Sequence, residues 1–172
     1  QPGTGATAVA AGATLGLGVG GAGTFSSADV DALFANTFPN VSMHATSGVG
    51  IDTTAGEFTY ATSVSGIRGL TKLGANNLVL PVANTYSGAT TINAGVLLLG
   101  HANALPGGIG TSGGTSALVF NGGVLGLGVG DFSRSLAAAA TTNAATFTDA
   151  GGWAAFNADR AVNLGGSVTP ST

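Results

Sequence analysis

Apolar residues occur along the chain in short runs that are separated by glycine, asparagine and proline. Short runs rich in valine, isoleucine, leucine and threonine, bounded by turn residues, are typical of β-strands. Clear turn signals are Gly74-Ala75-Asn76, Pro106-Gly107-Gly108 and Asn121-Gly122-Gly123. The pattern predicts strands at residues 14–19, 57–61, 77–82, 90–93, 96–99, 117–120, 124–127, 145–148 and 161–164.

One segment near the N-terminus has helical spacing instead. Residues 28–36 place Val30 and Leu33 on one face of a helix. Ser26, with Asp29 three positions later, resembles a capping box at the start of this segment. We therefore expect one short helix in an otherwise all-β chain. A second, weaker helix candidate is Ala137–Ala140.

The spacing of the strands suggests how they stack. Apolar runs begin at Leu78, Val96 and Leu118, at nearly even intervals. An interval of about 20 residues suits one coil of a parallel β-helix, in which each turn of the chain lays short strands on the previous turn. At about 4.8 Å per coil, residues 1–172 would form a single domain of roughly eight coils, near 40 Å long. A sandwich of hairpins is the alternative, but it would favour charged outward faces that the sequence lacks.

An internal echo supports a repeating structure. The segment Leu15-Gly16-Leu17-Gly18-Val19-Gly20 recurs unchanged as Leu125-Gly126-Leu127-Gly128-Val129-Gly130. A similar continuation with phenylalanine and serine follows each copy. The two ends of the chain are therefore expected to resemble each other, as the ends of a repeating array do.

The composition excludes several kinds of partner. Charged residues make up 6% of the chain, against roughly 25% in typical soluble proteins. The net charge is −3 and the four cations are scattered, so nucleic acid is an unexpected partner. The sequence has no cysteine for disulfides or thiolate metal sites. No run of strongly apolar residues is long enough for a membrane-spanning helix.

The central segment resembles a known family of bacterial surface proteins. Residues 69–106 read Gly69-Leu70-Thr71-Lys72-Leu73-Gly74, then Leu78-Val79-Leu80, then Asn84-Thr85-Tyr86-Ser87-Gly88 through Gly95, then Leu97 to Gly100 and Ala104-Leu105-Pro106. This text is similar to the autotransporter-associated β-strand repeat, and flanking stretches extend the similarity over most of residues 49–166. The resemblance implies a right-handed parallel β-helix outside a bacterial cell, with no catalytic residues. Pro81 departs from the family pattern and is expected at a corner, because proline cannot donate to a strand ladder.

Motifs that suggest chemistry are weak in this composition. Residues 18–23 fit the glycine pattern of dinucleotide sites, but no βαβ unit of suitable length follows. Residues 110–114 fit the pattern of a hydrolase nucleophile, but they lie among turn residues. The seven acids form no evident catalytic pair or calcium cluster, and His44 and His101 are expected at the surface. Tyr60, Tyr86 and Trp153 could stack on sugars if exposed, although a place in the core is expected. No catalytic, cofactor or metal site is predicted.

The sequence thus predicts a non-catalytic extracellular structural protein. The first hypothesis is a subunit that assembles head-to-tail with copies of itself into a surface fibre, because the open ends of a β-helix are templates for pairing. The apolar residues expected at these contacts are Leu15, Leu17, Val19, Val162 and Leu164. The second hypothesis is a stalk or adhesin fragment of an autotransporter passenger, with surface glycans or other cells as partners. A β-helical polysaccharide enzyme is the weakest alternative.

Overall fold

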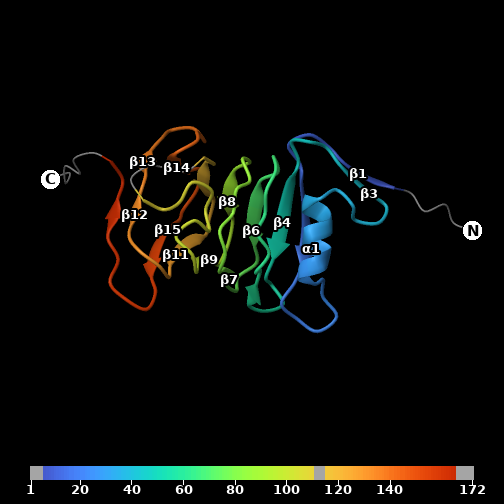
Figure 1. Cartoon of the computed structure of the whole chain (residues 1–172), viewed down its shortest axis with the longest axis horizontal. Coiled ribbons are helices and arrows are strands. Elements are labelled where there is room, and N and C mark those ends of the chain that lie inside the picture. Colours follow the sequence, from blue (N-terminus) through green and yellow to red (C-terminus); the bar gives the residue numbers. More distant parts are fainter. Residues whose placement is uncertain (1–5, 111–114, 166–172) are drawn as a thin grey trace, which may run out of the picture.

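The computed structural model of the chain describes residues 6–110 and 115–165 (Figure 1). These residues form short strands and one helix, α1, at Ser27–Phe34. The strands are β1 Thr7–Val9, β2 Thr14–Gly18, β3 Val41–Met43, β4 Gly48–Asp52, β5 Phe58–Thr59, β6 Leu70–Leu73, β7 Leu78–Leu80, β8 Thr90–Ile92, β9 Val96–Leu99, β10 Leu118–Phe120, β11 Val124–Leu127, β12 Phe132–Ser133, β13 Ser135–Leu136, β14 Ala144–Phe147, β15 Gly152–Ala155 and β16 Val162–Asn163.

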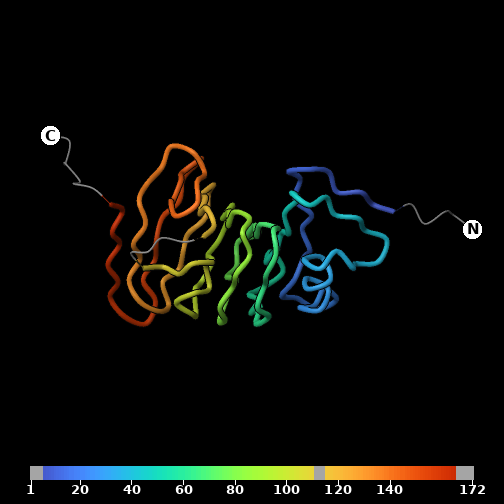
Figure 2. The backbone as a smooth tube through the Cα atoms, turned by 45° about the horizontal axis from the view of Figure 1, so that its top comes forward, coloured from blue at the N-terminus to red at the C-terminus, as the bar shows by residue number. Residues whose placement is uncertain are grey.

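Two parallel sheets contain most of the strands. The seven-stranded sheet has the order β13-β14-β10-β8-β6-β4-β2, and the five-stranded sheet has the order β15-β11-β9-β7-β5. From β4 to β11 the chain passes alternately from one sheet to the other. We call one such passage through both sheets a rung. The rungs lie side by side along the long axis of the molecule (Figures 1 and 2). The all-β class with parallel sheets and one helix is confirmed.

The register of the sheets confirms the predicted repeat only in the middle of the chain. Leu70 pairs with Thr90 in one sheet, and Leu78 pairs with Leu97 in the other. Both intervals agree with the predicted coil of about 20 residues. The next partner of Thr90 is Leu118, which lies clearly further along the chain. In the longer rungs the extra residues lie in the connection that leads from the five-stranded sheet back to the seven-stranded sheet, as between β9 and β10. The longer sheet has seven strands in the described residues, against roughly eight coils expected, and the even spacing assumed for these coils was wrong because the rungs are unequal.

The core is built from side chains that stand in register in adjacent rungs. Leu70 and Leu118 from the longer sheet and Leu78 and Leu97 from the shorter one are all fully buried. Burying one leucine side chain contributes about 1.5–3 kcal/mol. One inward row of the longer sheet contains Leu15, Val49, Leu70, Thr90, Leu118 and Ala145. The facing row contains Phe58, Leu78, Leu97, Leu125 and Trp153.

Glycines on the outer faces make room for apolar side chains of neighbouring rungs. A Cβ atom at Gly50 would lie 3.0 Å from the Leu73 side chain. On the other sheet, a Cβ atom at Gly126 would lie 3.0 Å from the side chains of both Leu98 and Phe156. Apolar side chains therefore lie flat over strand glycines on both sheets. This packing accounts for the combination of abundant glycine and few charged residues.

Helix α1 lies at the N-terminal end of the molecule (Figure 1). The backbone N–H and the hydroxyl of Ser26 both donate to the Asp29 carboxylate, at 2.8 and 2.7 Å, as the predicted cap requires. Val30 and Leu33 are fully buried, and the helix ends at Phe34, slightly before its predicted end. Since β5 is the last strand of its sheet and α1 follows β2, the helix takes the place of a strand in the first rung.

The two copies of the internal echo do not occupy equivalent positions. The first copy forms β2, at the edge of the seven-stranded sheet, whereas the second forms β11, inside the five-stranded sheet. The expectation that the echo marks similar ends was therefore wrong. The weak helix candidate at Ala137–Ala140 forms a bend in irregular structure and no helix. Pro81 directly follows β7, in agreement with its expected place at a corner.

The contact between Gly88 and the preceding rung gives a first prediction. A Cβ atom at Gly88 would overlap the backbone nitrogen of Gly69, whereas one at Gly152 would meet no atom within 4 Å. We expect Gly88→Ala to lower the free energy of unfolding by about 1–3 kcal/mol, because neither backbone can give way. The matched change Gly152→Ala should leave it within about 1 kcal/mol. Urea unfolding followed by circular dichroism measures both, and equal stability of the two variants would contradict the contact.

Candidate functional site

The most specific part of the family resemblance has a structural role. The side chain of Asn84 accepts a hydrogen bond from the Val64 N–H and donates to the Ala104 carbonyl, each at 2.8 Å. It thereby joins the segments on either side of its own. The Tyr86 hydroxyl and the Thr90 hydroxyl lie 2.7 Å apart in the core, where burial raises the pKa of Tyr86 to about 12. The buried side chains of Asn84 and Tyr86 therefore tie rungs together, whereas Thr85 and Ser87 of the same segment are exposed.

All four cations of the chain donate hydrogen bonds to backbone carbonyls. Arg68 reaches the carbonyls of Phe34 and Met43, at 3.1 and 3.2 Å, and so ties the end of α1 to β3. The remaining contacts are Lys72 to Leu73, Gly74 and Ala94, Arg134 to Pro106, Gly108 and Ser116, and Arg160 to Leu127 and Gly128. These side chains therefore act as clamps on the backbone. Sequence reasoning missed this role, because a carbonyl cluster forms only after distant rungs meet.

Lys72 and Arg134 are the most deeply buried of these clamps. The Lys72 ammonium has three carbonyl acceptors at 2.6–3.1 Å, two on its own turn and one, at Ala94, on the next. Burial lowers the pKa of Lys72 to about 8, and the nearby Asp52 carboxylate opposes this shift. Burial also lowers the pKa of Arg134, which is 3% exposed. A buried cation without carbonyl partners would be strongly destabilising, so these contacts are required by the core.

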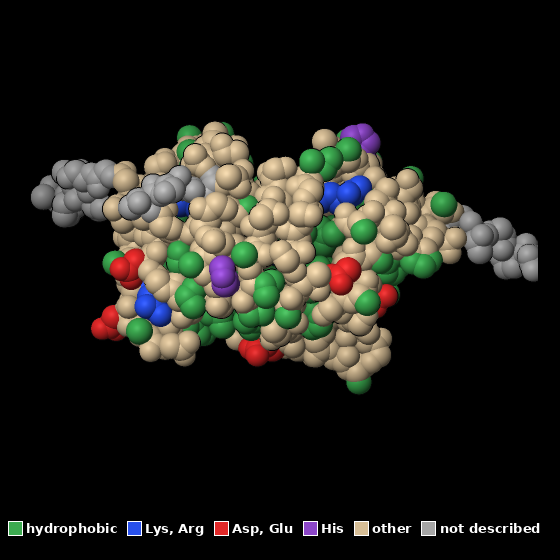
Figure 3. Space-filling view, viewed as in Figure 1, with side chains coloured by type: hydrophobic (Ala, Val, Ile, Leu, Met, Phe, Trp, Pro, Cys, Tyr) green, Lys and Arg blue, Asp and Glu red, His purple; other side chains and the backbone are tan. Residues whose placement is uncertain are grey.

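The carboxylates are dispersed, and those of Asp52, Glu57 and Asp131 accept hydrogen bonds either within a turn or from a neighbouring rung. Asp52 accepts from the N–H and the hydroxyl of Thr54, and Glu57 accepts from the side chain of Asn77. Asp131 accepts from the Ala161 N–H. Within residues 6–110 and 115–165, no group of three potential ligands is placed to hold a metal ion. Acidic and basic side chains are also few on the face in Figure 3.

The other predicted motifs do not form open sites. In the glycine pattern at residues 18–23, a Cβ atom at Gly20 would overlap the Gly56 carbonyl oxygen, so the loop is pressed against the next rung. The hydrolase pattern at residues 110–114 lies largely outside the described residues. Tyr60 and Tyr86 are fully buried and Trp153 is partly buried, so these rings form no open surface for stacking on sugars. His44 and His101 are exposed, as predicted.

The residues expected at end contacts have different environments. Leu17 and Val19 are 5% and 0% exposed and belong to the core, although β2 is an edge strand. Val162 is 38% exposed, whereas Leu15 and Leu164 are half-buried against the core. Their role in assembly stays a prediction.

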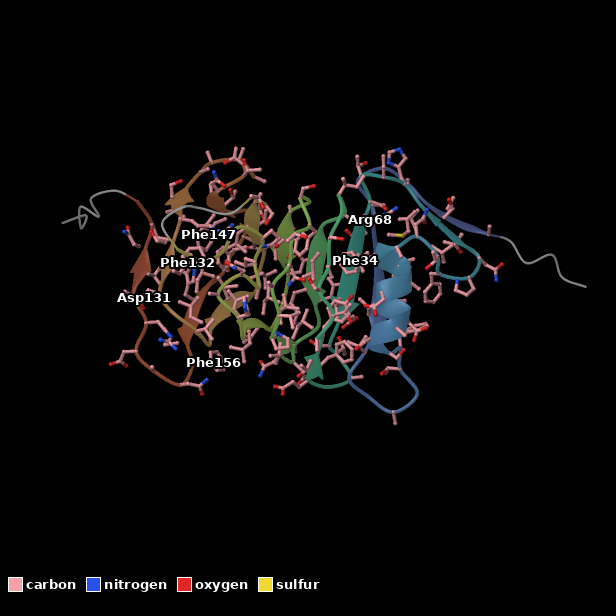
Figure 4. The ribbon with its side chains drawn as sticks, viewed as in Figure 1. Phe34, Arg68, Asp131, Phe132, Phe147 and Phe156 are labelled. Carbon is pink, nitrogen blue, oxygen red and sulfur yellow. The ribbon has the colours of Figure 1, made fainter. Side chains whose placement is uncertain are left out.

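The C-terminal end of the molecule exposes additional apolar side chains. Leu136 in β13 and Phe147 in β14 are 50% and 40% exposed, and Val162 in β16 is exposed at the same end of the molecule. Phe147 also belongs to a cluster of aromatic rings with centroid distances of 4.7–5.6 Å, whose other members are Phe120, Phe132 and Trp153. Figure 4 labels Phe132 and Phe147 in this part of the molecule. Sequence reasoning did not find Leu136 and Phe147, because their exposure depends on which strand is last in the sheet.

Titration of Lys72 gives a second prediction. Between pH 8 and 10 the unfolded chain keeps the lysine proton, whose ordinary pKa is 10.5, while the folded chain has released it. The free energy of unfolding should therefore rise with pH in this window, by about 1–3 kcal/mol. Above pH 10 it should fall, because burial raises the tyrosine pKa values. Since Lys72 is the only lysine, Lys72→Met should remove the rise, and a rise that persists in this variant would contradict the assignment.

Comparison with known proteins agrees with the central part of the structure. The sequence profile of the passenger-associated-transport-repeat matches residues 70–99, which span β6 to β9. No curated protein and no solved structure gives a significant match. No helix in the described part of the chain is long and apolar enough to cross a membrane. Residues 70–99 are therefore similar to the passenger-associated-transport-repeat, which confirms the predicted resemblance to the autotransporter passenger repeat family.

Proposed function

We propose that the chain is a non-catalytic, right-handed β-solenoid segment of an autotransporter passenger, which serves as a stalk outside a bacterial cell. The repeat at residues 70–99 supports the passenger role. The alternation of strands between two parallel sheets supports the solenoid, and right-handed connections are the rule between parallel strands.

The proposal of a non-catalytic role rests on the partners of the charged side chains. Each of the four cations is held by backbone carbonyls, as Lys72 and Arg134 show. A general acid, a general base or an anion-binding cation must instead face a substrate. A chain that uses its cations to join its own rungs is suited to rigidity.

The two ends of the molecule differ, and this difference favours a stalk with one growing end. At the N-terminal end α1 occupies the place beside β5 that a further strand would need. At the C-terminal end the Leu136 N–H of β13 donates to the Leu164 carbonyl, whereas β15 ends the five-stranded sheet with no strand beyond it among the described residues. Leu136, Phe147 and Val162 are exposed at this end. An unpaired edge beside apolar side chains is a template for another strand. We infer that a further solenoid coil, from the same polypeptide or from a second copy, stacks on this end.

A head-to-tail fibre is the second candidate function. It is favoured by the open strand edge of β2, which is the last strand of the seven-stranded sheet at the N-terminal end. Such a fibre would require each C-terminal end to pair with an N-terminal end. Helix α1 would have to move or share the contact, so the stalk is the preferred account.

The assembly of the purified chain separates the two functions and gives a third prediction. If only the C-terminal end accepts a partner, association should stop at a dimer, at no more than twice the monomer mass. Leu136→Lys/Phe147→Lys should shift the chain to monomer, because charges cannot be buried at the contact without a partner. The control Phe25→Lys/Ile67→Lys changes two comparably exposed apolar residues, 44% and 58% exposed, in other parts of the chain and should leave association unchanged.

Light scattering after size-exclusion chromatography, over a hundredfold range of concentration, measures these masses. Species that grow beyond the dimer would overturn the stalk account and favour the fibre. Equal effects of the two lysine pairs would show that the C-terminal end is not the contact.

A further inference from the structure

A hollow of about 260 Å³ lies between helix α1 and the segment that follows β5. Asp31 and Phe34 line it from the helix, and Tyr60, Thr62 and Ser63 line it from the facing segment. The rings of Phe34 and Tyr60 are stacked, with centroids 6.4 Å apart, and Phe34 lies between α1 and the neighbouring strands in Figure 4. Tyr60 is 1% exposed, so the hollow combines the partly exposed Phe34 ring with the partly exposed Asp31 carboxylate.

Three hydroxyl groups around this hollow have their protons engaged in hydrogen bonds. Tyr60 donates to one oxygen of Asp31 at 2.5 Å, and Thr62 donates to the other at 3.3 Å. Ser63 donates to the Ala83 carbonyl at 2.6 Å. A hydroxyl has one proton to donate and two lone pairs that accept. Since these three protons are engaged, the three groups present hydroxyl lone pairs beside the carboxylate, while the exposed Ser65 hydroxyl, which also lines the hollow, can still donate.

The Asp31 carboxylate also lacks a cationic partner within the described residues. Its hydrogen bonds come from two hydroxyls, and Arg68 nearby donates to the carbonyls of Phe34 and Met43 instead. Burial and the hydrogen bond to Asp31 both raise the pKa of Tyr60, so this hydroxyl stays a donor. A half-buried anion beside aromatic rings is complementary to a cation that only donates hydrogen bonds.

We infer that the hollow between α1 and the segment after β5 binds a primary ammonium group, with Asp31 as its counter-ion. A sugar fits less well, because the lone pairs of its several hydroxyls need donors, and of the hydroxyls that line the hollow only that of Ser65 is not already engaged. An ammonium group has three donors and no acceptor. The group could belong to a small amine or to a lysine side chain of another protein, and the two share this chemistry.

The test uses the whole chain labelled with ¹⁵N and titrated with n-butylammonium. We expect saturable shifts of the amide signals of Asp31, Thr62 and Ser63, with a dissociation constant on the order of 1 mM. n-Butanol, which has the same length and no charge, should bind at least tenfold more weakly. Nα-acetyl-lysine amide then distinguishes a lysine side chain from a free amine, since it carries the bulk of a backbone.

Asp31→Asn should weaken butylammonium binding at least tenfold, because it keeps the shape of the side chain and removes the charge. The control Asp159→Asn makes the same change of charge near the opposite end and should bind as the unaltered chain does. Equal binding of butanol and butylammonium to the unaltered chain would overturn the proposal, even if Asp31→Asn failed to fold. Shifts that do not saturate, or equal losses in the two variants, would also overturn it.

Discussion

The structure depends on one constraint, which is that each rung must return to the same register as the rung before it. Parallel neighbours in both sheets keep their partners although the rungs that follow β5 differ in length. The backbone hydrogen bonds between rungs are satisfied only in that register. The turns from the seven-stranded sheet to the five-stranded sheet are short throughout. The connections in the opposite direction vary in length and account for the different lengths of the rungs. Rungs can therefore differ in length without loss of the hydrogen bonds between their parallel strands.

The same constraint decides how polar side chains are used. Every rung brings carbonyl groups at its corners into the interior, and each must find a donor. Asn84 supplies donors and acceptors to the segments on both sides, while Lys72 and Arg134 supply several donors from one side chain. The result is a molecule whose interior contains charge and whose sheet faces carry little. Such an interior suits a rigid spacer, and it leaves the hollow beside α1 as a separate feature of the N-terminal cap.

Local patterns predicted the regular part of the fold well. Val96–Leu99 and Val124–Leu127 match their predicted bounds, because strong apolar runs lie between glycine turns. β4 and β15 were missed, because glycine and alanine within them weaken the strand signal. The burial of Lys72 and Arg134 also escaped prediction, since it depends on carbonyls from distant rungs. The sequence pointed to strand edges as contacts, but it could not reveal that Leu17 and Val19 turn inward.

The register between adjacent rungs is the central claim, and paired cysteines test it most directly. The chain has no cysteine of its own. Val79 and Leu98 are partners in adjacent strands, whereas Ala154 lies two strands beyond Leu98 in the same row. Strand neighbours are about 4.8 Å apart, within the usual span of a disulfide, but three strand spacings are far beyond it.

We would measure disulfide formation by mass spectrometry after mild oxidation of Val79→Cys/Leu98→Cys and of the control Val79→Cys/Ala154→Cys. The account predicts an intramolecular disulfide in the first protein and two free thiols in the second. Free thiols in the first protein, or equal oxidation of both, would contradict the register on which the whole structure rests.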